Sequence, residues 1–216
     1  MSIVIRNLSD QLVSLVRERV LAGTVPLDRP IRQDALAAEL GISKIPLREA
    51  LARLEQEGLL RSQANRGFFV RELSRDEAEE VFTIRMRLEP DTMALGAERA
   101  TDAERKTASD LYDTLYQVTD QGGDGVGAFN RAFHLALLNP SRQRLTVSVL
   151  ERVHVLSERY VRKHLEPLGR DDRANEEHRE ILDAWLSRDV AILRDLTERH
   201  IGKTMDDLRQ QLAATG

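Results

Sequence analysis

The sequence predicts a mainly α-helical protein in two parts. The first is an N-terminal winged helix-turn-helix with a small β-hairpin over residues 1–73, and the second is an all-α bundle of six helices over residues 74–216. Within residues 31–70, two helical apolar patterns flank a tight turn and are followed by two short apolar runs around a polar turn. Beyond residue 73, strand patterns disappear and helix-start signals recur. With 216 residues, 41% of them hydrophobic, the chain is long enough to form two small cores.

The first part is expected to contain three helices and a hairpin. Apolar residues recur at helical spacing in its first segment, where Ser9 can serve as the N-cap and Gly23 as the end. A loop over residues 24–32, which holds two prolines, separates this helix from the helix-turn-helix pair. The predicted bounds are 9–22, 33–40 and 44–57 for the helices and 59–71 for the hairpin.

The second helix of the pair has the chemistry of a helix that meets DNA. Ser43 is a favourable N-cap, and Pro46 falls in the first turn, where its missing N–H costs no hydrogen bond. Lys44 and Arg48 share a face near the N-terminus, where positive charge opposes the helix dipole, so we expect an anionic partner. The alternative is that both are ordinary solvated side chains, but the adjacent turn and hairpin favour DNA. The opposite, core-facing side carries Leu47, Leu51 and Leu54.

The stretch SKIPLREALARLEQEGLL, followed by NRGFFV, resembles the DNA-binding domain of the GntR family of bacterial transcription regulators. The family pattern is matched at its Ser, Pro, Arg-Glu-Ala-Leu and Asn-Arg-Gly positions. Lys44 stands where the family usually has Arg, and Lys lacks the bidentate fork of a guanidinium group. The resemblance implies that an operator of double-stranded DNA is contacted by Ser43, Lys44, Arg48 and, at the wing tip, Arg66 and Gly67.

Charge is unevenly divided along the chain. The net charge is −4, but residues 1–75 hold 12 basic and 9 acidic side chains, whereas residues 76–216 hold 20 and 27. A basic surplus in the first part suits binding to phosphates. Because this surplus is only +3, we expect tight binding to require a homodimer with two recognition helices.

Three absences narrow the class of protein. The sequence has no cysteine, no run of eighteen apolar residues and no N-terminal pattern of a secretory signal. We therefore expect a cytoplasmic protein with no membrane partner, no disulfide and no thiolate site.

The second part reads as consecutive helices. Capping-box patterns begin two of them, at Ser74–Glu77 and Thr101–Glu104. The glycine-rich stretch QGGDGVG lacks the preceding strand and the Gly-Lys-Ser/Thr ending of a phosphate-binding loop, so we interpret it as a connector. The predicted helices span about 75–99, 102–120, 125–138, 141–165, 172–187 and 190–213.

This helical part resembles the FCD domain, the effector-binding and dimerisation domain of the FadR-like branch of the same family. The resemblance rests on Arg85-x-x-Leu88-Glu89, on Phe133-His134 with Asn-Pro five residues later, and on Glu177-His178. Six helices rather than seven favour the shorter, VanR-like version.

Three of the five histidines occupy apolar helix faces. His134, His178 and His200 each recur at helical spacing with leucine or isoleucine, so each is expected to turn into the bundle. They could converge on a metal, or each could be a core histidine satisfied by a hydrogen bond. The family resemblance implies a metal-ligand set of Asn130, His134, His178 and His200. His154 and His164 match no ligand position and are expected at the surface or at a helix end.

Asn130 departs from the family, which has an aspartate at that position. A neutral amide oxygen is a weaker ligand than a carboxylate and leaves the full metal charge in the pocket. Two outcomes stay open: the site holds Zn²⁺ or Ni²⁺ weakly and an anionic effector completes it, or the histidines bind a carboxylate directly. Arg85 either points inward to bind a small organic acid or pairs with Glu89 on its own helix.

The favoured function is a ligand-responsive transcription regulator, a repressor released by a small carboxylate metabolite bound in the helical domain. One alternative is a metal-dependent enzyme built on the three histidines, although no general base is evident because Glu177 should not face the metal. Another is a DNA-binding protein with a non-functional sensor domain.

Overall fold

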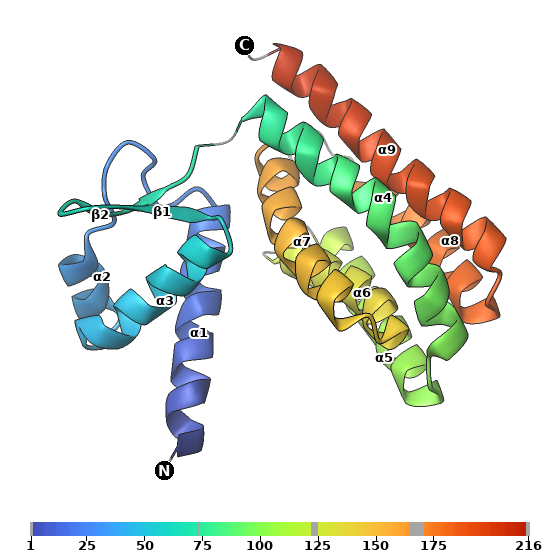
Figure 1. The fold of residues 1–216 in the computed structure, drawn as a ribbon, viewed down its shortest axis with the longest axis horizontal. Coiled ribbons are helices and arrows are strands. Elements are labelled where there is room, and N and C mark those ends of the chain that lie inside the picture. Colours follow the sequence, from blue (N-terminus) through green and yellow to red (C-terminus); the bar gives the residue numbers. More distant parts are fainter. Residues whose placement is uncertain (1, 73, 122–124, 165–170, 215–216) are drawn as a thin grey trace. The chain divides into compact units, whose positions relative to one another are not determined.

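The computed structural model describes residues 2–72, 74–121, 125–164 and 171–214. The chain divides into two compact units, Met1–Leu73 and Ser74–Gly216, which are described separately. In the first unit α1 (Ser2–Leu21) packs against α3 (Lys44–Gln56), and α2 (Gln33–Glu39) precedes α3 across a tight turn (Figure 1). Strands β1 (Leu60–Gln63) and β2 (Gly67–Val70) form an antiparallel hairpin.

One face of α3 contributes to the core of the first unit, where it packs against α1. Leu47, Leu51 and Leu54 are fully buried, which confirms the core-facing side predicted for this helix. The hairpin turn places Asn65 at φ 61° and Gly67 at φ 93°, and the left-handed region is one that glycine and asparagine occupy readily. The hairpin predicted over residues 59–71 is therefore confirmed.

The start of α1 differs from the prediction. The helix begins at Ser2, so Ser9 lies inside it and is not an N-cap. Nothing between residues 2 and 8 breaks a helix, since this segment has no glycine or proline, and a serine inside a helix costs little. The helix ends at Leu21, and Gly23 follows at φ 68°.

The described part of the second unit holds six α-helices, and each predicted bound lies within three residues of the observed one. Ser74 accepts a hydrogen bond from the Glu77 N–H, and Thr101 and Glu104 form a complete capping box. The predicted glycine-rich connector falls largely on residues 122–124, outside the described residues. The helices are α4 (Arg75–Arg99), α5 (Asp102–Asp120), α6 (Val126–Leu138), α7 (Arg144–His164), α8 (Asp171–Ser187) and α9 (Val190–Ala214), with a short 3₁₀ turn, η1 (Asn139–Ser141).

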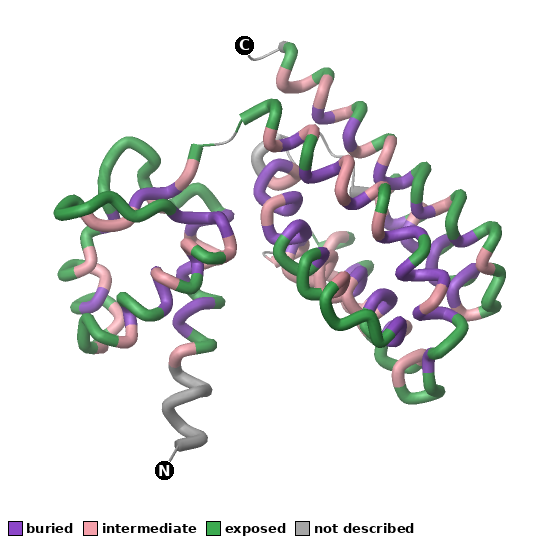
Figure 2. Tube along the Cα trace, viewed as in Figure 1, coloured by how far each residue is buried: buried purple, intermediate pink, exposed green. Residues whose placement is uncertain are grey.

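A single core fills the second unit. Met93, Phe133 and Trp185 are fully buried, and the Trp185 indole N–H donates to the Leu137 carbonyl at 3.2 Å. A Cβ at Gly96 would lie only 2.2 Å from the Leu137 carbonyl oxygen, so glycine permits α4 to approach α6 closely. Helices α4 and α9 lie side by side, and the buried positions face neighbouring helices (Figures 1 and 2). Among the described helices, none has the length and apolar character needed to cross a bilayer.

Candidate functional site

The N-terminus of α3 presents the predicted DNA-contacting side chains to solvent. Ser43 has the backbone of an N-cap, but its hydroxyl makes no capping hydrogen bond. Lys44 forms an ion pair with Asp34 of α2, so part of its charge already has an anionic partner within the protein. Arg48 is exposed and forms no ion pair or hydrogen bond with any described residue. Of the two cations, Arg48 is therefore the freer to meet a phosphate or a base.

The hairpin turn presents a second cationic surface. The guanidinium groups of Arg61 and Arg66 lie 4.8 and 5.9 Å from the ring centre of Phe69, in cation–π geometry. Gly67, with a φ of 93°, follows Arg66 and is the first residue of β2. Ile45, in the first turn of α3, was not predicted as a DNA-contacting residue, but it is 71% exposed. Its position next to Lys44 in the predicted recognition helix could have indicated this from the sequence.

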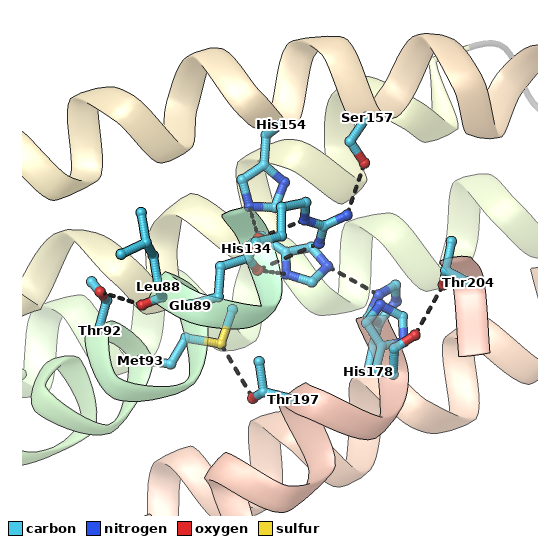
Figure 3. A network of polar contacts seen from close by, with 12 residues as sticks. Leu88, Glu89, Thr92, Met93, His134, His154, Ser157, His178, Thr197 and Thr204 are labelled. Atoms are coloured by element: carbon cyan, nitrogen blue, oxygen red, sulfur yellow. Dashed lines mark hydrogen bonds and ion pairs between the residues drawn. The ribbon is translucent and has the colours of Figure 1, made fainter. Parts of the chain in front are cut away.

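The three inward histidines meet in the interior of the second unit. His134 on α6, His178 on α8 and His200 on α9 are buried, and each offers a ligand atom within 4.8 Å of the others. The Nε2 atoms of His134 and His178 are 3.3 Å apart (Figure 3). Two nitrogens bound to one tetrahedral metal at about 2.1 Å are separated by about 3.4 Å. The spacing therefore fits a shared divalent metal, and it also fits a hydrogen bond between the two rings.

The protonation of these histidines suits ligation. Burial lowers the pKa of His134 and of His178 well below the usual value, and their neighbouring histidines and Arg85 lower it further. Both rings are therefore neutral near pH 7, which is the form that binds a metal. The Nδ1 atoms of both rings are buried with no hydrogen-bond partner among the described residues.

His154 contradicts the prediction of a surface or helix-end position. Its side chain is 2% exposed on α7, and its Nε2 lies 3.1 Å from Glu89 Oε1. Leu150 and Ser157, four residues before it and three after, are buried on the same face, so the helical spacing used for the other histidines also applied here. The side chain of His164 lies outside the described residues, although α7 ends at that residue.

Arg85 pairs with Glu89, one of the two possibilities left open, and its side chain also points into the bundle. It is buried, it donates from Nε to Glu89 at 2.5 Å, and it donates from NH1 to the Ser157 hydroxyl at 2.8 Å. Burial would raise the pKa of the Glu89 carboxyl, but Arg85 and His154 outweigh it and lower this pKa to about 2. Glu89 is therefore an ionised carboxylate in the core, held beside His134 and His154.

Glu177 forms a hydrogen bond with Nδ1 of His200. Its Oε2 is 2.7 Å from His200 Nδ1, and its Oε1 is 2.8 Å from Lys203 Nζ. Burial would raise the pKa of Glu177, but hydrogen bonds from His200 and Lys203 lower it to about 2. An ionised carboxylate only accepts hydrogen bonds, so His200 donates from Nδ1 to Glu177.

A cavity of about 90 Å³ adjoins the histidines. Asn130, one turn before His134, lines this cavity together with Arg85, His178 and His200, while His134 itself is not among its lining residues. Apolar side chains of Leu115, Val126 and Val161 form other parts of its wall. The cavity thus combines a polar, imidazole-lined end with apolar sides, as small-molecule sites commonly do.

Comparison with known proteins agrees with this architecture. Residues 8–70 match the model for bacterial regulatory proteins of the gntR family, and residues 80–203 match the model for the FCD domain. The chain is 36% identical over 132 residues to the "Nta operon transcriptional regulator" of Aminobacter aminovorans, a match that spans 60% of each chain. It is 25% identical over 199 residues, 90% of this chain and 86% of the relative, to the "Probable D-xylose utilization operon transcriptional repressor" of Paenarthrobacter nicotinovorans.

Solved structures show the same fold. The structure of E. coli McbR/YncC covers 95% of this chain and 98% of that protein, with a TM-score of 0.78 and 26% identity. These relatives are transcription regulators and not enzymes, so the enzyme alternative is not favoured. The chain belongs to the GntR family of bacterial transcription regulators, as a DNA-binding protein with an N-terminal winged helix-turn-helix and a C-terminal FCD effector-binding domain.

Proposed function

We propose that the protein is a cytoplasmic repressor that binds its operator as a homodimer and leaves it when a small carboxylate metabolite occupies the second unit. The observation that carries this proposal is the buried histidine cluster beside a cavity, in a domain type that binds effectors. The relatives named for the control of operons, one of them a repressor, support the direction of the switch.

We assign DNA binding to residues 1–73 and effector binding with dimerisation to residues 74–216. In the first unit, Arg48 and Lys44 would contact phosphates or base edges from the start of α3, with the unused Ser43 hydroxyl beside them. Arg66 and Gly67 would bring the hairpin turn against the backbone of the duplex. Each proposed contact lies on a described exposed or half-buried position.

In the second unit, we propose that His134, His178 and His200 hold Zn²⁺ or Ni²⁺, with Asn130 as a fourth, neutral ligand. The neutral imidazoles and the 3.3 Å nitrogen spacing support this ligand set. When bound, the metal would supply a positive anchor for a carboxylate. Arg85 lines the same cavity, and because Glu89 and Ser157 already bind its guanidinium, we expect it to shape the site more than to neutralise the effector.

A binding assay tests the whole scheme. Purified full-length protein would be mixed with a fluorescent DNA fragment from the region upstream of its own gene, with and without a panel of small carboxylic acids. We expect at least one acid to raise the melting temperature and to weaken DNA binding, because an allosteric ligand must bind the two states with different affinity. If DNA binds tightly and no acid changes either quantity, the sensor is non-functional and the proposal is wrong.

A further inference from the structure

Two carboxylates lie near the Nδ1 atoms of two of the three histidines, and one of them is within hydrogen-bond distance. Glu177 Oε2 is 2.7 Å from His200 Nδ1, within hydrogen-bond distance. Glu89 Oε2 is 3.7 Å from His134 Nδ1, which has no hydrogen-bond partner among the described residues. The Glu89 side chain is fully buried and that of Glu177 is 12% exposed. The third histidine, His178, also has a buried Nδ1 with no hydrogen-bond partner among the described residues.

A carboxylate beside Nδ1 controls which ring nitrogen of a histidine can bind a metal. A neutral histidine carries one proton, and a carboxylate at Nδ1 keeps the proton there and leaves the Nε2 lone pair to bind a metal. The same contact fixes the orientation of the ring and raises the basicity of the ligating nitrogen. Such outer partners matter most where the direct ligands are neutral, because neutral ligands do not offset the charge of the ion.

We infer that Glu89 and Glu177 are positioning residues of the metal site, and that Glu177 supplies negative charge which Asn130 does not. This inference rests on the proposed metal site. Each of the two carboxylates is held in place by the fold. Glu89 is fixed by the Arg85 guanidinium and lies beside His154, and Glu177 is fixed by Lys203.

The neighbouring cations offset the two carboxylates to different extents. Of the cations paired with the two carboxylates, Arg85 is buried, whereas the side chains of Lys203 and Arg173 are 47% and 43% exposed. Water screens exposed charges strongly, so Lys203 and Arg173 offset little of the Glu177 charge inside the cluster. Arg85 therefore offsets the charge of Glu89, and the charge of Glu177 is the one that remains beside the histidines.

Zinc titration of full-length protein tests the inference. Metal-stripped wild type, Glu177→Gln, Glu89→Gln, His178→Ala and Glu79→Gln would be titrated with Zn²⁺ against a chromophoric chelator, with no effector present. Glu79 is the matched control, since it lies on α4 and pairs with Arg209 away from the histidines. We expect the Glu177 and Glu89 variants to bind zinc about 10- to 100-fold more weakly, and Glu79→Gln to bind like wild type.

The spectrum of bound Co²⁺ gives a second readout, because a change in ring orientation or ligand basicity alters its visible bands. Failure of wild type to bind zinc would overturn the metal site itself, and with it this inference. If wild type binds zinc and His178→Ala does not, but Glu177→Gln matches wild type in affinity and in Co²⁺ spectrum, the site stands and the positioning role falls. Glu177→Gln decides the matter should Glu89→Gln fail to fold with Arg85 left unpaired, and circular dichroism of each variant reports folding.

Discussion

Lys44 and Arg48 lie one helical turn apart, yet their electrostatic surroundings differ. Asp34 pairs with Lys44, whereas no described residue pairs with Arg48. A surface ion pair contributes only about 0–1 kcal/mol, so Asp34 does not prevent Lys44 from reaching DNA. However, the Asp34 carboxylate competes with DNA phosphates for Lys44, the residue that stands where the family usually has arginine. Arg48 has no such competitor among the described residues, so we expect it to be the main cation of α3 in DNA binding.

Replacement of Arg48 by Ala is therefore expected to weaken binding to the operator by roughly 1–3 kcal/mol, because a contact to a base or phosphate is lost without any loss of core packing. Fluorescence anisotropy at fixed ionic strength measures the change. Operator affinity equal to that of wild type would show that α3 is not the recognition helix.

Replacement of Asp34 by Ala should act in the opposite direction. It frees Lys44 and removes a negative charge near the phosphates, so we expect DNA affinity to rise by up to about fivefold at low salt, the equivalent of about 1 kcal/mol. Asp10→Ala, which breaks the exposed ion pair with Arg53, is the control. An equal gain in both variants would mean that net charge alone, and not Lys44, is responsible.

At the scale of the element, helix bounds in the second unit were predictable because their signals are local. Thr101 and Glu104 cap α5 through contacts three residues apart, and such contacts can be read directly from sequence. The start of α1 was not predictable from Ser9, because a good capping residue does not end a helix that can continue through it. The close approach of α4 to α6 at Gly96 also carried no readable signal, since it depends on where the Leu137 carbonyl lies.

Gly96→Ala tests that approach. An added Cβ would sit 2.2 Å from a backbone oxygen, so the helices must separate, and we expect a loss of about 1–3 kcal/mol in the free energy of unfolding. Gly202→Ala on α9 is the control, because its Cβ would meet nothing within 4 Å and alanine favours helix by about 1 kcal/mol. Urea denaturation compares the two, and a stable Gly96→Ala protein would show that α4 and α6 are less tightly packed than described.

At the scale of the molecule, the buried histidines make stability depend on pH. His134 and His178 have pKa values well below 6.5 in the folded protein because they are buried. Above pH 6.5 both the folded and the unfolded forms are neutral. As pH falls below 6.5, the unfolded chain takes up protons first, so folding loses stability.

We therefore expect metal-free protein to lose about 1.4 kcal/mol for each of these histidines per pH unit below about 6.5. Urea denaturation in a chelator between pH 7.5 and pH 5.5 measures the loss. His178→Phe should show a shallower dependence on pH, and equal slopes for the variant and the wild type would contradict the assignment of the shift to His178.

The fold class, the helix-turn-helix and wing, and the inward faces of His134, His178 and His200 could be predicted from the residues alone, because each follows from local capping, turn residues and helical periodicity. The packing of the helices was needed to show which side chains from different helices meet: His154 with Glu89, Arg85 with Ser157, and Glu177 with His200. Such pairs join helices that are far apart in the chain. Their distances depend on how the helices pack, and no periodicity within one helix encodes the position of another.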